Sequence, residues 1–389
     1  MKILKLSILT AALTIASMPV FSSESGRVYG QILQEAETVQ QKYEAALVAA
    51  PLNDPEVFPY LSDALDWTLG MRSSIKPGSD RETYERLTQL LVAALGQARY
   101  TNAAASVMRV VDDSQNPLTK SEALIALGTM RAVEYAERIS LLLRDLNNQP
   151  TSDPEYGEKI AYGCVIALER MRSPLGFAPL FFASEGWYSK RTRDQATQSL
   201  SLILDDPSDA ISAILSIESP ARMIRALELE LRSEAPSAAK RSVSELALAR
   251  GIAFSPRNKL EMKEVSELRI KAMNALAAAG KGDGKAAGNM VEAYAIGPFD
   301  EKLVALKALG ADKTSASALA LKNIILELDA NQRAGLVDEI RNALMKAALQ
   351  NAAIHAGKEL SPAIQTVLIN SGWSSGILTL ATAAQKALQ

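Results

Sequence analysis

The chain has 389 residues, which exceeds the size of a single compact core and leaves two or three globular domains or one elongated repeat array. Only 5% of its residues are aromatic, and the abundance of alanine and leucine favours helices over sheet. The formal net charge of −2 provides no basic excess for a phosphate backbone, which argues against a nucleic-acid partner.

The N-terminus has the features of a secretory signal peptide. Lys2 and Lys5 form a charged start, Leu6 to Met18 is an apolar and small-residue segment, and the tripeptide ending at Ser22 fits the small-x-small cleavage rule. The apolar segment is too short for a membrane span, and no later segment is long and apolar enough for one. We therefore expect residues 1–22 to be cleaved and the mature chain to be exported, to a periplasm or outside the cell.

The next part of the chain reads as helical. Residues 28–50, 57–71 and 80–97 each predict one helix, with turns at the prolines and glycines between them. These helices fit the repeat pattern of the following segment poorly. Because terminal repeats are usually atypical, we expect residues 23–115 to form an N-terminal helical cap.

Five later stretches share one pattern, in which a leucine follows a small residue four positions earlier and another small residue directly before it. The leucines are Leu127, Leu168, Leu200, Leu276 and Leu309; the earlier small residues are Ala123, Cys164, Ala196, Ala272 and Ala305; the adjacent ones are Ala126, Ala167, Ser199, Ala275 and Ala308. Four stretches also have a basic residue seven positions before the leucine, namely Lys120, Arg193, Arg269 and Lys302. Such recurrence indicates a stacked helical array.

The pattern has a physical reason. Residues four apart lie on one helix face, so a small side chain lets a neighbouring helix approach while the leucine fills the remaining space. Cys164 occupies a position that alanine fills elsewhere, and a lone cysteine forms no internal disulfide. We expect it to be a small buried side chain.

Three of the stretches resemble a known repeat. Lys120–Gly128 and Lys302–Gly310 look like the second helix of a HEAT repeat, and Arg193–Ile211 is similar to the version with an aspartate-proline turn. The resemblance implies an all-α fold, a right-handed superhelical α-solenoid of stacked antiparallel helix pairs with a docking surface. We expect the array to span residues 116–330, with a C-terminal helical cap at 331–389.

Three features that could indicate a catalytic or phosphate-binding site are better explained as structural elements. His355 is the only histidine and lies beside a predicted helix end. The segment Gly280–Lys285 has the wrong spacing for a phosphate loop and no preceding strand. Gly372–Gly376 matches a nucleophile elbow but lacks the acid and histidine that must follow it. We therefore expect no catalytic, cofactor or metal site.

One cluster combines aromatic and basic residues, the types that dominate binding hot spots. It lies between two predicted helices, in residues 181–193. Two interpretations stay open: a docking patch, or core aromatics beside solvated charges. The residues predicted to bind a partner are Trp187, Tyr188, Lys190, Arg191 and Arg193.

These observations predict an exported, non-catalytic helical scaffold that binds a protein or peptide. The alternative is an all-helical, periplasmic, glycan-active enzyme. That enzyme would need several tryptophan and tyrosine side chains along one groove with a carboxylate at its centre.

Overall fold

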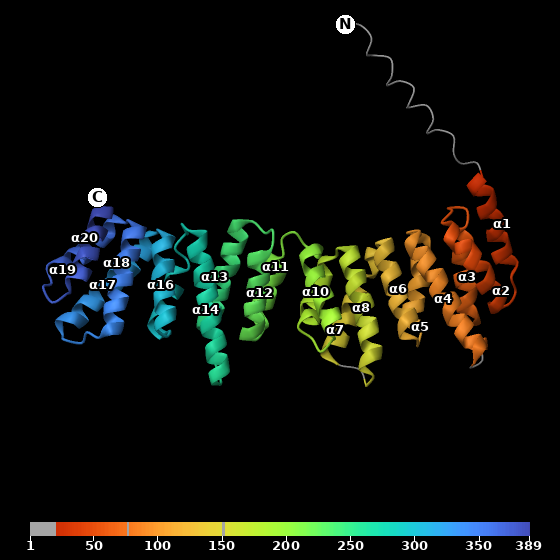
Figure 1. The fold of residues 1–389 in the computed structure, drawn as a ribbon, viewed down its shortest axis with the longest axis horizontal. Helices are drawn as coiled ribbons and strands as arrows, with labels where there is room; N and C mark the ends of the chain where they lie inside the picture. The colour runs from red at the N-terminus through yellow and green to blue at the C-terminus, as the bar shows by residue number, and fades with distance from the viewer. Residues whose placement is uncertain (1–20, 76–77, 150–151) are drawn as a thin grey trace, which may run out of the picture. The chain divides into compact units, whose positions relative to one another are not determined.

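A computed structural model describes residues 21–75, 78–149 and 152–389, and these residues form helices and turns without any strand. The predicted signal peptide, apart from its last two residues, lies outside this part of the chain. The chain divides into two compact units between Leu204 and Asp205 (Figure 1). The predicted all-α fold of stacked antiparallel helix pairs is confirmed within each unit.

The described residues of unit 1 form ten α-helices, which pack as five consecutive pairs. They are α1 (Phe21–Glu35), α2 (Val39–Ala49), α3 (Phe58–Met71), α4 (Ser79–Gln97), α5 (Ala104–Asp113), α6 (Pro117–Met130), α7 (Ala136–Asn148), α8 (Pro154–Met171), α9 (Phe177–Ser184) and α10 (Lys190–Ile203). Short 3-10 turns lie at Ala50–Leu52, Arg72–Ser74, Thr101–Ala103, Val133–Tyr135 and Pro174–Gly176.

Unit 2 contains the other ten described α-helices, again in five pairs. They are α11 (Ser208–Ile217), α12 (Pro220–Arg232), α13 (Ser237–Ala253), α14 (Lys259–Ala279), α15 (Ala287–Ile296), α16 (Phe299–Asp312), α17 (Ser315–Arg333), α18 (Glu339–His355), α19 (Ser361–Leu368) and α20 (Ser375–Ala387). One 3-10 turn, Lys358–Leu360, precedes α19.

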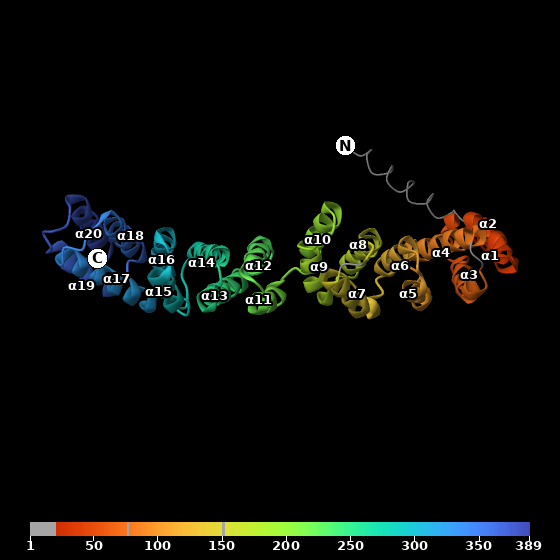
Figure 2. The same ribbon diagram turned by 90° about the horizontal axis from the view of Figure 1, so that it is seen from below.

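Each unit has two layers (Figure 2). Even-numbered helices pack on one another along one layer, and odd-numbered helices form the other. In unit 1 the closest association is between α6 and α8, and α4 packs on the other side of α6. The C-terminal ends of α4, α6 and α8 therefore lie in a row.

Local sequence signals fix where helices begin. The side chains of Asn116, Asp153 and Asn258 each accept a backbone N–H in the first turn of the helix that follows. Pro117 and Pro154 occupy first helical positions, where a missing N–H costs nothing. The repeat leucines lie at different distances from these caps, but each lies three residues before the last residue of its helix.

The repeat pattern describes the core. All five leucines and all five small residues four positions earlier are buried, Cys164 among them. Four of the five adjacent small residues are also buried, and Ala275 is half-buried. Small residues are needed here because the neighbouring helices are very close. A Cβ built on Gly128 would stand 2.6 Å from the Cα of Ala167, and one on Gly96 would stand 2.7 Å from the Cβ of Ala126. Neighbouring helices thus touch through backbone.

One predicted helix is wrong. Residues 28–50 were expected to form a single helix, but the chain breaks into α1 and α2. Thr38 accepts the Gln41 N–H at 3.2 Å, and the Gln41 side chain accepts the Thr38 N–H at 3.2 Å. This capping box starts a new helix where the apolar pattern alone suggests continuity.

A polar contact recurs between neighbouring even-numbered helices. The Thr119 hydroxyl of α6 donates to Glu85 of α4 at 2.7 Å, and the Thr192 hydroxyl of α10 donates to Glu158 of α8 at 2.9 Å. Glu85 lies ten positions before the buried Leu95, and Glu158 lies ten positions before the repeat leucine Leu168. The two hydroxyls each lie eight positions before a repeat leucine. This contact fixes the register between adjacent repeats.

Candidate functional site

The two aromatic members of the predicted partner-binding cluster have structural roles. The Trp187 indole donates to the backbone carbonyl of Leu146 at 3.0 Å, and the Tyr188 hydroxyl donates to Asn147 at 2.9 Å. The two rings are 4.4 Å apart, and Tyr188 is buried. Burial raises the pKa of the Tyr188 hydroxyl. Both side chains attach the α9–α10 loop to the end of α7.

The three basic members are exposed on α10. Lys190 forms an ion pair with Asp194, and the guanidinium of Arg191 lies 4.7 Å from the ring centroid of Tyr162. Arg193 extends from the same helix. The structure therefore separates the cluster into an aromatic anchor, with Tyr188 buried and Trp187 half-buried, and an exposed basic edge. Contact of that edge with a partner stays a prediction.

His355 and Cys164 are both part of the packing. The Gly357 N–H donates to Nδ1 of His355 at 3.1 Å, which places the ring proton on Nε2, within 3.1 Å of the Thr314 carbonyl. Cys164 is buried, and desolvation raises the pKa of its thiol. Burial therefore favours the neutral thiol form of Cys164.

The glycine-rich loop at 280–285 is attached to its own unit. The Arg241 guanidinium donates to the Gly280 carbonyl at 3.1 Å and to the Asp312 carboxylate at 2.8 Å. The Gly282 N–H donates to the backbone carbonyl of Asp312 at 2.9 Å. These contacts give the loop a structural role between α14 and α15.

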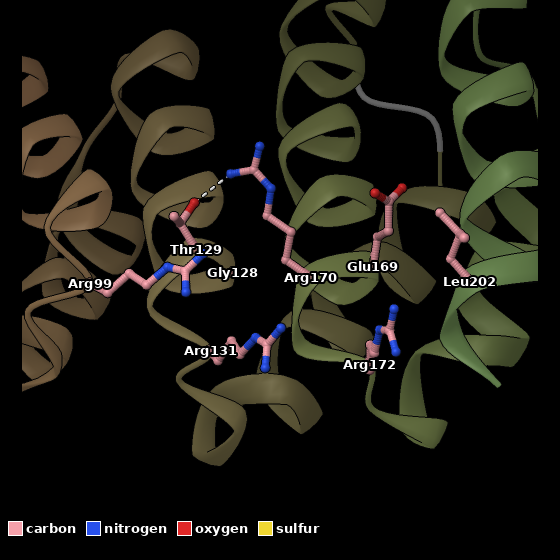
Figure 3. A pocket seen from close by; sticks show the side chains of 8 residues that line it. All are labelled: Arg99, Gly128, Thr129, Arg131, Glu169, Arg170, Arg172 and Leu202. Atoms are coloured by element: carbon pink, nitrogen blue, oxygen red, sulfur yellow. Dashed lines mark hydrogen bonds between the residues drawn. The ribbon is translucent and has the colours of Figure 1, made fainter. Parts of the chain in front are cut away.

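A groove of about 430 Å³ lies at the C-terminal ends of α4, α6 and α8 in unit 1 (Figure 3). We call it the arginine groove. Four arginines and one glutamate line it, which gives a formal net charge of +3. Its lining consists of Arg99, Gly128, Thr129, Arg131, Glu169, Arg170, Arg172 and Leu202.

Three of these arginines occupy equivalent positions. Arg99, Arg131 and Arg172 each lie four residues after a buried leucine, just past the end of α4, α6 or α8. All three have left-handed backbone conformations, with φ of 52°, 58° and 50°. The residue after Arg131 donates its N–H to Leu127 at 3.1 Å, and the residue after Arg99 does the same to Leu95 at 3.0 Å. Both helices therefore end in Schellman motifs.

The arginine charges are not neutralised by partners. Within the described part of unit 1, Arg99, Arg131 and Arg172 form no ion pair, and all three are exposed. Arg170 donates to the Thr129 hydroxyl, as the dashed line in Figure 3 marks. Glu169 accepts hydrogen bonds from Gln195 at 2.8 Å and Ser199 at 2.6 Å, both on α10. These bonds hold its carboxylate on the α10 side of the groove.

The sequence contains a signal for this groove that the leucine pattern did not include. Arg99, Arg131 and Arg172 each end a segment that begins with Ala-Leu, namely Ala94–Arg99, Ala126–Arg131 and Ala167–Arg172. The first segment was missed because Leu91 stands four positions before Leu95, where the pattern requires a small residue. A fourth segment, Ala308–Lys313, ends in a lysine with φ of 52° in unit 2.

Two further features bear on the kinds of site present. Among the described residues, no group of three or more histidine, cysteine, aspartate or glutamate side chains is placed to hold a metal ion. No helix in the same residues combines the length and apolar character that a membrane span requires.

Comparisons with known proteins add little. No protein-family model matches the chain. No curated protein matches it either. Among solved structures, human deoxyhypusine hydroxylase in complex with glycerol is similar over 94% of this chain and 96% of its own, with 17% identity and a TM-score of 0.28. A similarity at this level assigns neither an activity nor a ligand to this chain.

The predicted function, an exported non-catalytic scaffold for a protein or peptide, is wrong as an inference from the fold. The solved structure named above is by its name a hydroxylase, and none of the comparisons shows an exported scaffold. The glycan-active alternative required several aromatic side chains around a carboxylate. The arginine groove contains Glu169 but no aromatic side chain.

Proposed function

We propose that unit 1 binds a ligand with multiply charged oxyanions, such as phosphate groups, in the arginine groove. The observation that carries the proposal is the repetition of Arg99, Arg131 and Arg172 at equivalent helix ends, unpaired and lining one concave surface. A guanidinium presents a planar fork of donors that matches phosphate and carboxylate oxygens in a bidentate geometry.

Helix stability alone does not account for these arginines. A side chain in the left-handed region costs about 1 kcal/mol relative to glycine, which is the usual residue after a helix end. The attraction of a cation to the C-terminal end of the helix dipole contributes about 0.3–1 kcal/mol. The two effects nearly cancel, so glycine would serve the helix end as well, as Gly280 does after α14. Binding of an anionic ligand explains why arginine, and not glycine, follows these helices.

Two further proposals concern the whole chain. We propose that it is a HEAT-like α-solenoid, on the basis of the repeat signatures and the paired helices. We also propose that residues 1–22 direct its export to a periplasm or outside the cell, on the basis of the N-terminal charge and apolar pattern. Because the chain has a formal net charge of −2 and no basic excess, we do not propose nucleic acid as its ligand.

The test is a phosphate titration of the full chain, followed by ³¹P NMR at constant ionic strength. We expect saturable broadening of the orthophosphate signal that Arg131→Gln weakens about tenfold, because a hydrogen bond to a charged group contributes about 1.5–3 kcal/mol. Lys313→Gln is the matched control, since it removes one charge at an equivalent left-handed position in unit 2. Equal loss in both variants, or no saturable binding, would overturn the proposal.

A further inference from the structure

The spacing of the arginines limits which anions can occupy the whole groove. Arg99, Arg131 and Arg172 project from the ends of successive packed helices, α4, α6 and α8 (Figure 3). Packed helix axes are about 8–10 Å apart. The first and last of these helix ends are therefore separated by about 16–20 Å, which is two such steps. In Figure 3 each of the three guanidinium groups lies near its own helix end and they do not converge, so one phosphate group does not span them in this arrangement.

The net charge of the groove also indicates a ligand with more than one anionic group. A phosphate monoester carries about −1.5 to −2 at neutral pH, whereas the groove has a formal charge of +3. One phosphate group neutralises about half of that charge, and two neutralise all of it.

The groove also divides into two parts. Arg99 and Arg131, at the ends of α4 and α6, have no carboxylate beside them in the lining. Arg172, at the end of α8, lies on the side of Glu169, whereas the Arg170 guanidinium turns toward Thr129 of α6 (Figure 3). The α4–α6 part therefore has the higher positive charge and binds the first anionic group, and the α8 part binds a second.

We propose that the ligand of the arginine groove is an elongated molecule with at least two phosphate groups, separated by about one helix-to-helix step. Arg99 and Arg131 bind one phosphate group, and Arg172 binds the other. This inference rests on the proposed binding of oxyanions and specifies the number and separation of the anionic groups.

The experiment compares orthophosphate with α,ω-alkane bisphosphonates of increasing chain length, by isothermal titration calorimetry on the full chain. Linking two anions makes the second contact intramolecular, and the gain is largest when the linker matches the distance between the subsites. We expect affinity to rise at least tenfold over orthophosphate and to pass through a maximum with chain length. Affinity that does not change with chain length would overturn the inference.

Variants separate this inference from the general proposal. We expect Arg172→Gln to change orthophosphate affinity less than twofold and to lower the affinity of the best bisphosphonate at least tenfold. Arg131→Gln should weaken both ligands. If orthophosphate binding depends on Arg131 but Arg172→Gln affects both ligands equally, oxyanion binding stands and the two-subsite model fails.

A last comparison tests the chemical class. Alkane dicarboxylates of the same lengths carry one charge at each end, so they neutralise less of the groove. We expect them to bind at least tenfold more weakly than the matching bisphosphonates. Equal affinity of the two series would overturn the assignment to phosphate.

Discussion

Arg269 of α14 and Glu301 of α16 form a buried ion pair, with Nη2 of the arginine 3.1 Å from Oε2 of the glutamate. The Ser266 hydroxyl donates to the same carboxylate at 2.7 Å, and Arg269 also donates to the Gly251 carbonyl of α13 at 3.1 Å. Three helices of unit 2 therefore meet at one satisfied polar cluster.

Removing one partner of this pair should destabilise unit 2. We expect Glu301→Gln to lower the free energy of unfolding by about 3–5 kcal/mol, because it leaves a buried guanidinium without its counter-charge. Urea denaturation followed by circular dichroism measures the loss. As a control, Asp112→Asn breaks the exposed pair with Arg138 and should cost less than about 1 kcal/mol. Similar losses in the two variants would contradict the expected role of burial.

Close backbone contact should make Gly128 intolerant of any side chain. A Cβ there would stand 2.6 Å from the Cα of Ala167, and backbone cannot rotate away from it. We expect Gly128→Ala to destabilise unit 1 by about 1–3 kcal/mol in thermal or urea unfolding. Gly70→Ala in α3, where nothing lies within 4 Å of the new Cβ, should instead stabilise by about 0.5–1 kcal/mol. A neutral Gly128→Ala would contradict the packing between α6 and α8.

Arg131→Gly should separate ligand binding from stability. Glycine removes the charge and also relieves the left-handed backbone at φ 58°. We expect the unfolding free energy to stay within about 1 kcal/mol of the parent chain, because the lost dipole interaction and the relieved strain are of similar size. Phosphate affinity should fall about tenfold, which calorimetry measures. A large loss of stability would show that the arginine serves the helix end.

Glu169→Gln should act in the opposite direction. It removes the one carboxylate in the lining but keeps an acceptor for Gln195 and Ser199. We expect the affinity of the best bisphosphonate to rise by a factor of about two to five, since an exposed charge pair contributes about 0.2–1 kcal/mol. The affinity of orthophosphate, which binds at Arg99 and Arg131, should change less than twofold. Glu155→Gln, which alters an exposed pair with Lys159 outside the groove, should change nothing.

The stabilisation that Glu158 provides between α8 and α10 should depend on pH. Desolvation raises the pKa of Glu158, but hydrogen bonds from Ser189 and Thr192 outweigh it and hold that pKa below its usual value. A carboxyl group with a lowered pKa in the folded state stabilises the fold above its unfolded-state value of 4.5, and this stability is lost as pH falls through the folded-state pKa. Glu158→Gln should therefore cost about 1 kcal/mol at pH 7, and the difference should disappear at low pH. Urea unfolding from pH 7 to pH 3 checks this, and a difference that persists in acid would contradict it.

The contacts of the basic residue seven positions before four of the repeat leucines could not be predicted from the pattern. Arg269 pairs with the Glu301 carboxylate of the neighbouring even-numbered helix. Lys302 instead donates to the carbonyls of Tyr294 and Ala295 at the end of α15, and Arg193 is exposed on α10. One sequence position thus has different contacts, because the partner comes from a segment that the helix pattern does not specify.

The sequence by itself determined the helical class of the fold and the buried face of the repeat helices. Helical periodicity is local, so Ala123, Leu127 and Cys164 could be placed in the core from spacing alone. The tertiary structure alone decided that Arg99, Arg131 and Arg172, far apart in the chain, line one groove. It also decided that Trp187 turns back onto α7. Such contacts depend on the distance and register between packed helices, which are set by side chains of both partners and are not contained in the periodicity of either one.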